Sequence, residues 1–345
     1  SEVQEAILEL TDENEVKGLV LDLRGNPGGL LNESVRLCNL FIDKNQEVVS
    51  TKGKIKDWDK SYKTMKEPLD KELPLAVLIN QSSASASEIV SGTIQDLDRG
   101  VVIGKKSFGK GLVQQTRKLS YNSQLKVTVA KYYTPSGRCI QALDYTNKND
   151  DGSVGKVADS LKTAFKTRNG RTVFDGGGVD PDIVIDQEAF AKIVGSLVSK
   201  QLIFDFATEF VLENDSIEAP GVFKISDALY EDFVMFLSDK EYEYETNTEK
   251  KMAELIDKAE DEYADFKEDL ELLQKKLLSY KEDDIHKYQS QVSELILSEL
   301  MARYYYQEGR VIASLADDTV LKEAISVLHD SDRYEAILSG NLDDK

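Results

Sequence analysis

Hydrophobic and polar positions divide the chain into two differently patterned parts. Over residues 1–186, short continuous apolar runs alternate with segments of helical spacing. The runs at 16–24 and 73–81 are typical of strands buried on both faces of a sheet. Over 187–345, apolar residues recur at three- and four-residue intervals with opposite charges between them, which indicates helices. We therefore expect an α/β core over 1–186 and a largely α-helical domain over 187–345.

The elements expected in the first part alternate in type. Further strands are expected near 47–54 and at 101–105, 111–120 and 124–135, and helices at 2–12, at 30–43 and from the serine cluster after residue 81 to Gly100. The order strand, helix, strand favours a parallel sheet. Residues 146–156 are expected to form a loop, and the glycine-rich segment 170–185 a turn followed by a short strand.

Composition narrows the class of function. The chain has 345 residues with 41% apolar content, enough for two or three domains. Its net charge of −20 argues against nucleic acid and against anionic membrane surfaces as partners. No apolar run approaches the roughly 18 to 20 residues that a membrane-spanning helix requires.

The scarce cysteines and histidines restrict the chemistry further. Cys38 and Cys139 make no disulfide framework, and we expect each to be a buried small hydrophobe. His286 and His329 both lie in the last fifth of the chain. A His-based triad or a multi-His metal site in the first part is thereby excluded unless the C-terminal part folds back.

Three kinds of lysine chemistry fit the stretch "GKKSFGKG" around Lys110. Gly104-x-x-x-x-Gly109-Lys110 approximates a phosphate-binding loop, but Gly111 stands where that loop needs Ser or Thr, and the segment that follows looks extended. Ser107-x-x-Lys110 has the spacing of penicillin-recognising acyl enzymes, whose S-D-N and K-T-G elements are absent. The third interpretation makes Lys110 the base that deprotonates a distant serine.

Ser85 is the serine that could use such a base. It follows the expected strand at 73–81, at the carboxyl edge of a parallel sheet where reacting groups gather. Ser85-x-x-Glu88 is also a capping box, so Ser85 could simply cap the helix. The two roles are compatible, because a helix N-terminus also offers N–H groups to an oxyanion.

Three motifs now identify a family. "LVLDLRGNPGG", "NQSSASASEIVSGTIQD" and "SFGKGLVQ", in this order and spacing, resemble the carboxyl-terminal processing proteases, tail-specific serine peptidases with a Ser-Lys dyad. With "YYTPSGRCIQ" and "GGGVDPDI", the resemblance covers about residues 2–186. It implies a crotonase- or Clp-protease-like α/β core that cleaves polypeptides through an acyl-enzyme, with no metal and no cofactor.

The resemblance also assigns the dyad. It maps the nucleophile to Ser85, the general base to Lys110 and an orienting amide to Gln114. A lysine acts as a base at neutral pH only if burial lowers its pKa from about 10.4 by several units. We therefore expect Lys110 to be buried and to share a strand face with Leu112 and Gln114.

The oxyanion donors follow from the same resemblance. They are the N–H of Ala86 and an N–H of the glycine pair after "DLRGNP", where we favour Gly29 over Gly28. A Gly-Gly turn lets backbone N–H groups approach a substrate without Cβ interference. Asp96 is expected to face solvent or the end of its helix, and Glu88 to act as a cap rather than an acid.

The resemblance leaves partners and context open. Such proteases usually carry a PDZ domain, and none is present here, so we expect a fragment of a longer exported, periplasmic protein with a PDZ domain in cis. A natural relative without this domain is the alternative. A homodimer, and a role of the helical part in dimerisation, shielding or substrate delivery, stay open. The competing function is a non-catalytic ligand- or peptide-binding module on the same fold, as in retinoid-binding repeats.

Overall fold

The computed structural model divides the chain into two compact units. It describes residues 2–13, 15–148, 151–186, 189–262, 264–281 and 283–341. The first unit comprises Ser1–Asp186 together with Thr319–Lys345, and the second comprises Gln187–Asp318. The boundary expected at residue 187 falls on this division, although residue 187 itself lies outside the described residues.

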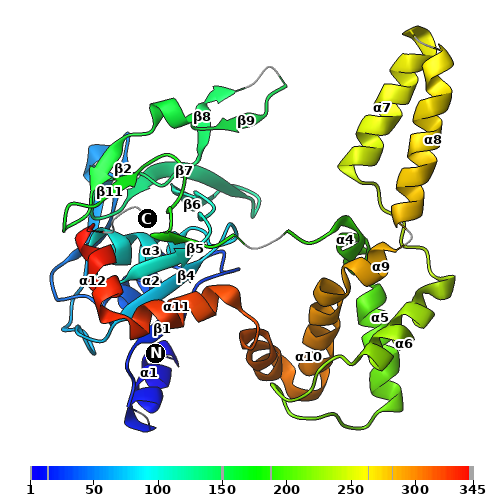
Figure 1. Ribbon diagram of the computed structural model, residues 1–345. Coiled ribbons are helices and arrows are strands. Elements are labelled where there is room, and N and C mark those ends of the chain that lie inside the picture. Colours follow the sequence, from blue (N-terminus) through cyan, green and yellow to red (C-terminus); the bar gives the residue numbers. More distant parts are fainter. Residues whose placement is uncertain are drawn as a thin grey trace. The chain divides into compact units, whose positions relative to one another are not determined.

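A parallel sheet of four strands forms the centre of the first unit (Figure 1). Its strands, in spatial order, are β1 (Leu19–Asp22), β4 (Leu75–Ile79), β5 (Val101–Gly104) and β12 (Ile183–Val184). Each neighbouring pair is parallel. The predicted α/β class with a parallel sheet is therefore confirmed, and the apolar runs at 16–24 and 73–81 contain two of its strands.

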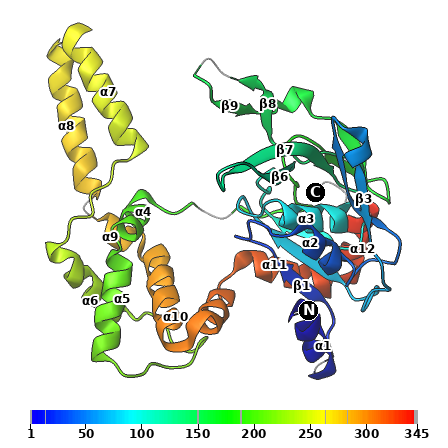
Figure 2. The ribbon, with the colours of Figure 1, turned by 180° about the vertical axis from the view of Figure 1, so that it is seen from behind.

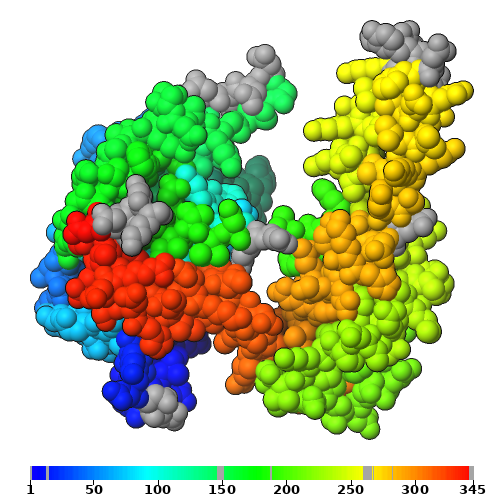
Figure 3. Space-filling view, in the orientation of Figure 1, coloured from blue at the N-terminus to red at the C-terminus, as the bar shows by residue number. Residues whose placement is uncertain are grey.

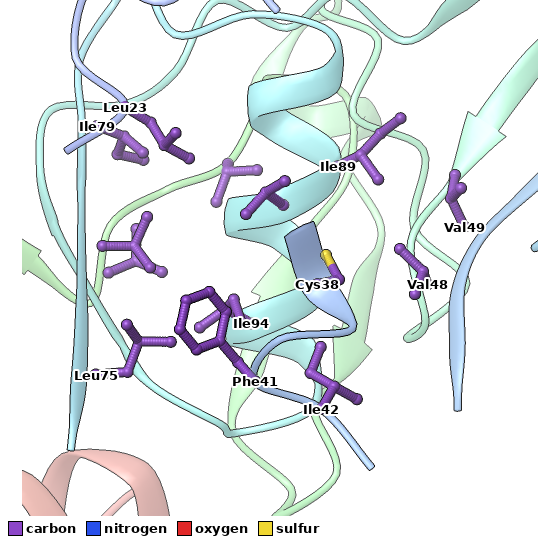
Figure 4. Packing of buried hydrophobic residues seen from close by; sticks show 14 of the residues in the cluster. Leu23, Cys38, Phe41, Ile42, Val48, Val49, Leu75, Ile79, Ile89 and Ile94 are labelled. Atoms are coloured by element: carbon purple, nitrogen blue, oxygen red, sulfur yellow. The ribbon is translucent and has the colours of Figure 1, made fainter. Parts of the chain in front are cut away.

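One face of this sheet is covered by α2 (Leu31–Cys38) and α3 (Ala86–Asp96), as Figure 2 shows. Leu75 and Ile79, at alternate positions of β4, pack in one buried cluster with Ile89 of α3 (Figure 4). The N-terminal helix α1 (Glu2–Glu13) contributes Ile7 to this cluster. Cys38 is fully buried there, and burial raises the pKa of its thiol to about 12, so it is the small hydrophobe that we expected.

The other face of the sheet is covered by the last two helices, α11 (Thr319–His329) and α12 (Ser331–Ser339), which lie across the first unit in Figure 3. Ala76 and Leu78 of β4 pack in one cluster with Val327 of α11. A strand that is apolar at every position needs cover on both faces, and these helices supply the second cover. This corrects the expected single domain over 187–345, because its last part returns to the α/β unit.

An antiparallel sheet lies beside the parallel one. Its order is β3-β2-β7-β6, with bounds β2 (Glu47–Gly53), β3 (Lys60–Lys63), β6 (Leu112–Lys118) and β7 (Gln124–Tyr133). A 3-10 turn, η1 (Lys56–Trp58), joins β2 to β3. The apolar pattern predicted strands at three of these places but not their pairing in a separate antiparallel sheet.

Two short hairpins complete the first unit. They are formed by β8 (Leu143–Lys148) with β9 (Val154–Lys156) and by β10 (Ala164–Lys166) with β11 (Thr172–Phe174), and a 3-10 turn η2 (Asp159–Leu161) lies between the hairpins. The loop expected at 146–156 thus contains strand residues at both ends, while residues 149–150 lie outside the described residues.

The second unit is helical, as expected from its spacing. Its elements are α4 (Lys192–Ser199), α5 (Leu202–Glu213), α6 (Asp227–Phe236), η3 (Leu237–Asp239), α7 (Asn247–Glu262), α8 (Ala264–Lys281), α9 (Asp284–Lys287) and α10 (Gln289–Leu315). Tyr230 and Phe233 of α6 pack in its core with Ile296 of α10. Among the residues described, no helix is both long and apolar enough to cross a membrane.

Candidate active site

Ser85 occupies the turn between β4 and α3. It is the residue before the first helical residue and has a φ of 55° and a ψ of −111°. A positive φ at a residue with a Cβ costs about 1–3 kcal/mol, and such strain persists where the surroundings fix it. Ser85 is half-buried, whereas Ala84 and Ala86 on either side are buried. The strand-to-helix turn therefore presents this serine at the carboxyl edge of the parallel sheet, as predicted.

Glu88 joins the Ser85 turn to the loop at 105–111, which contains Lys110 and is called the lysine loop below. Its side chain is fully buried, and its Oε2 accepts hydrogen bonds from the backbone N–H groups of Ser85 at 2.9 Å and Lys110 at 2.8 Å. Its Oε1 accepts from Ser107 Oγ at 2.6 Å and from the Gly109 N–H at 2.7 Å. The capping box in the sequence predicted only the hydrogen bond between Glu88 and the Ser85 N–H. The hydrogen bonds from the lysine loop depend on a tertiary contact between residues that are 22 positions apart.

Burial gives Glu88 a pH-dependent effect on stability. Desolvation raises the pKa of its carboxyl above the ordinary value of 4.5, although four hydrogen bonds oppose the shift. A carboxyl whose pKa is raised on folding binds its proton more tightly in the folded state, so its contribution to stability is present at low pH and is lost as pH rises through the raised pKa.

We therefore expect the free energy of unfolding of the wild-type protein, relative to that of Glu88→Gln, to rise as pH falls from 7 toward 4.5. Urea denaturation of both proteins across this range measures the difference, and other titrating groups cancel in it. A difference that is flat, or that shrinks toward low pH, would contradict a buried carboxyl group whose desolvation outweighs its four hydrogen bonds.

The glycine turn after β1 packs directly on the Ser85 turn. The Asn26 carbonyl accepts from the Ala84 N–H and from Ser87 Oγ, each at 3.0 Å. The Gly28 N–H donates to Asn26 Oδ1 at 2.9 Å. By contrast, no hydrogen bond within the described chain uses the N–H of Gly29, which is exposed. Of the two glycines, Gly29 thus keeps a free donor beside the serine turn.

A Cβ at Gly28 would collide with this turn. Gly28 has a φ of +89°, and an added Cβ would lie 2.4 Å from Ala84 O and 2.6 Å from Ala86 N. We expect Gly28→Ala to lower the free energy of unfolding by about 2–3 kcal/mol and to reduce any activity of Ser85 by at least about tenfold. Gly29→Ala is the matched control, because an added Cβ there meets nothing within 4 Å. Equal denaturation midpoints for the two variants would contradict the close packing.

Lys110 and Gln114 differ from expectation in their burial. Lys110 is exposed and lies two residues before β6, and Gln114 is an exposed residue of β6. In the described part of the chain, the Lys110 side chain makes no hydrogen bond or ion pair, with Ser85 Oγ or any other group. The expectation of a buried Lys110 is wrong for this structure, because the flanking Phe108 is itself exposed and Leu112 only half-buried.

Tyr132 is a residue of the site that sequence reasoning missed. It lies on β7, is half-buried, and its N–H donates to the Gly111 carbonyl at 2.8 Å. Burial raises the pKa of its phenol, and a hydrogen bond with the Ser85 side chain opposes that rise. No spacing rule could place Tyr132 beside Ser85, since the contact depends on how the antiparallel sheet packs against α3.

Asp96 is buried rather than solvent-facing. It pairs with Arg138 at 2.8 Å, and both side chains are completely buried. Gln95 also accepts from Arg138 at 2.7 Å. The helix end expected to meet solvent is instead covered by the segment around Arg138, so Asp96 anchors that segment to α3. Removing either partner would leave an unpaired buried charge.

Family models match both parts of the chain. Residues 1–148 match the model described as peptidase family S41, and residues 193–328 match the model described as the C-terminal helical domain of a probable PDZ-protease. The first unit thus carries a domain of a peptidase family. More particularly, residues 1–148 belong to peptidase family S41, and the chain's homologues are carboxy-terminal processing proteases. The motifs at 19–29, 80–96 and 107–114 had indicated this family. The helical part offered no motif from which its own match could be predicted.

Two curated relatives agree with the family match. A carboxy-terminal-processing protease of Bartonella bacilliformis is 44% identical over 149 residues, which are 42% of this chain and 34% of that protein. A probable CtpA-like serine protease of Staphylococcus haemolyticus is 46% identical over 128 residues, 36% of this chain and 25% of that protein. The photosystem II D1 C-terminal processing protease has a similar structure at 31% identity and a TM-score of 0.40, over 53% of this chain and 38% of that one. The matches therefore span only about a quarter to a third of the two curated relatives' lengths.

Proposed function

We propose that this chain is the catalytic part of a serine endopeptidase of the carboxyl-terminal processing type, with Ser85 as nucleophile and Lys110 as general base. The observation that carries the proposal is the shared carboxylate of Glu88. One buried oxygen accepts from the N–H groups of both Ser85 and Lys110, so the nucleophile turn and the lysine loop are held side by side. This contact brings together the two segments that carry the proposed dyad, which capping of α3 alone does not require.

The reaction follows from these positions. Ser85 Oγ attacks the peptide carbonyl while neutral Lys110 takes its proton, and Lys110 then returns the proton to the leaving amine. Water hydrolyses the acyl-enzyme by the same route. The N–H groups of Ala86 and Gly29 stabilise the oxyanion. In support, the Gly28 N–H is already bound to Asn26, whereas that of Gly29 has no partner within the described residues. Gln114, which is exposed and not bonded to Lys110 here, orients the Lys110 side chain in the substrate complex.

Because Lys110 is exposed, the proposed mechanism requires the bound substrate to remove water from around its side chain. Removal of water from around an ammonium group disfavours its charged form. A peptide that lies over Lys110 would supply this desolvation and bring its Nζ toward Ser85 Oγ. The base would thus be complete only when substrate is bound. Polypeptide substrates, recognition of their C-termini, a PDZ domain in cis, a homodimer and export to the periplasm remain predictions from the family.

Cleavage of an unstructured protein tests the proposed function. The folded chain is incubated with a natively unfolded protein, and the products are identified by mass spectrometry. New peptide termini that accumulate with time, and that are absent with Ser85→Ala, are the expected result. No cleavage by the folded chain would reject the proposal, and saturable binding of an apolar ligand in its place would support the non-catalytic module.

A further inference from the structure

The segment that contains Lys110 is strongly basic, in contrast to the rest of the chain. Residues 99–143 hold nine Lys and Arg residues and no Asp or Glu, whereas the whole chain has a net charge of −20. This segment forms β5, the lysine loop and the hairpin of β6 and β7. Positive charge is thus gathered next to the candidate active site.

The pairing of the strands places three of these nine charged residues on one face of the sheet. Leu112 lies opposite Lys131, Thr116 opposite Lys126, and Lys118 opposite Gln124. Directly opposite residues share a face, and so do alternate residues of β6. The register shifts by one residue between Val113, opposite Ala130, and Gln114, opposite Thr128. Because of this bulge, Lys126 and Lys131 lie on the same face although they are five residues apart. Lys52 of β2 lies opposite Lys131 in the next pairing and joins the same face.

We call this surface the basic face. It is defined by four lysines from three strands: Lys52, Lys118, Lys126 and Lys131. All four side chains are exposed. None forms an ion pair with a residue in the described ranges. Lys52 Nζ lies over the Tyr133 ring, 5.0 Å from its centroid, but like charges directly opposite, as at Lys52 and Lys131, destabilise a sheet.

We propose that the basic face is a docking surface for acidic, extended segments of the polypeptide substrate; this inference rests on the proposed peptidase function. The basic face and the candidate site share one hairpin: Lys110 lies two residues before β6, and Tyr132, the neighbour of Lys131 on β7, contacts Ser85 from the opposite face of the sheet. β6 is also the edge strand of its sheet, and its residues from Gln114 to Lys118 are exposed. A segment held there by charge would pass around this edge strand to reach Ser85.

An acidic polypeptide fits better than another polyanion. A nucleic acid or an anionic membrane presents a large field that the surplus acidic charge of the chain would repel. A short acidic segment needs only the local lysines. At about 0.1 M ionic strength the attraction between opposite charges extends over about 10 Å, so a segment that lies along neighbouring strands is within range of these lysines.

Binding is tested in the Ser85→Ala background, so that the result does not depend on cleavage. Fluorescence anisotropy compares a labelled peptide rich in Glu with the same peptide carrying Gln at those positions. We expect the acidic peptide to bind about tenfold more tightly at about 20 mM salt, and within about twofold at about 500 mM. Equal affinities at low salt, or tighter binding of a single-stranded oligonucleotide of the same charge, would overturn the proposal.

Charge-neutralising variants locate the surface. Lys118→Gln/Lys126→Gln/Lys131→Gln should abolish the preference for the acidic peptide. A control that removes the same charge from exposed positions of α7 and α8 should retain the preference: Lys251→Gln/Lys275→Gln/Lys276→Gln. Arg117→Gln is a second control, because Arg117 lies on the opposite face of the hairpin. A preference that survives in the first variant would overturn the proposal.

Cleavage separates this proposal from the proposed function. With Ser85 intact, the first variant should lose about tenfold in kcat/KM for an acidic substrate and stay within about twofold for its neutral counterpart. Failure of the wild-type protein to cleave either substrate would reject the peptidase and leave the binding result standing. Equal losses for both substrates would instead overturn the selective docking of acidic segments.

Discussion

Ser85→Ala and Lys110→Ala are each expected to reduce cleavage of an unstructured protein by at least about 10³-fold, because a nucleophile and its base act as one unit. Ser85 is half-buried and Lys110 exposed, so neither truncation opens a cavity in the core. Initial rates of substrate loss measure the effect. Circular dichroism and denaturation midpoints should stay at their wild-type values.

Two exposed residues provide matched controls for these variants. Ser82→Ala removes a hydroxyl from the same serine cluster, and Lys60→Ala removes a lysine from β3. Both should retain activity within about twofold, as surface substitutions usually do. Wild-type rates in Ser85→Ala or in Lys110→Ala would exclude the dyad, and loss of activity in both control variants would point to a nonspecific effect.

Glu88→Gln carries the second large expected effect. The carboxylate accepts four hydrogen bonds, and an amide nitrogen in place of one oxygen would face a buried backbone N–H that then loses its acceptor. Ser107 cannot compensate freely, because its Oγ already accepts from the Val179 N–H at 2.7 Å. We expect the free energy of unfolding to fall by about 1–3 kcal/mol and kcat/KM to fall by about 10–100-fold, as the turn and the loop shift apart.

Glu33→Gln is the control for this substitution. Glu33 is an exposed residue of α2, and among the described residues its carboxylate pairs only with Arg36. Its replacement should leave both stability and activity near the wild-type values. If Glu88→Gln lost stability but kept its kcat/KM, Glu88 would be a structural residue only and the shared-carboxylate argument for the site would fail.

The strands and helices that carry the site could be predicted because local pattern decides them. The apolar run of β4, the serine cluster and Gly100 give the start and end of the segment that bears Ser85 without any tertiary information. Gly28 and Gly29 could be named for the same reason, since a glycine pair after a buried strand signals a close approach of backbone. The choice of Gly29 is now supported by the hydrogen bond that occupies Gly28.

Features that depend on contacts between distant segments could not be predicted. The exposure of Lys110 depends on whether other segments cover Phe108 and Leu112. The local sequence does not determine that cover. Burial of Asp96 depends on Arg138, 42 residues further along. The return of α11 and α12 follows from the second apolar face of β4, which the sequence displayed, but their helical pattern alone did not distinguish them from the second unit.

Covalent labelling of the nucleophile tests the central claim most directly. The protein is treated with a fluorophosphonate probe carried on a short peptide, which covers Lys110 as a substrate would, and the modified peptide is mapped by mass spectrometry. A mass increase at Ser85 is predicted, absent in Ser85→Ala and slowed by at least about 10²-fold in Lys110→Ala. Labelling at another residue, or labelling of Ser85 at an unchanged rate in Lys110→Ala, would contradict a Ser85–Lys110 dyad.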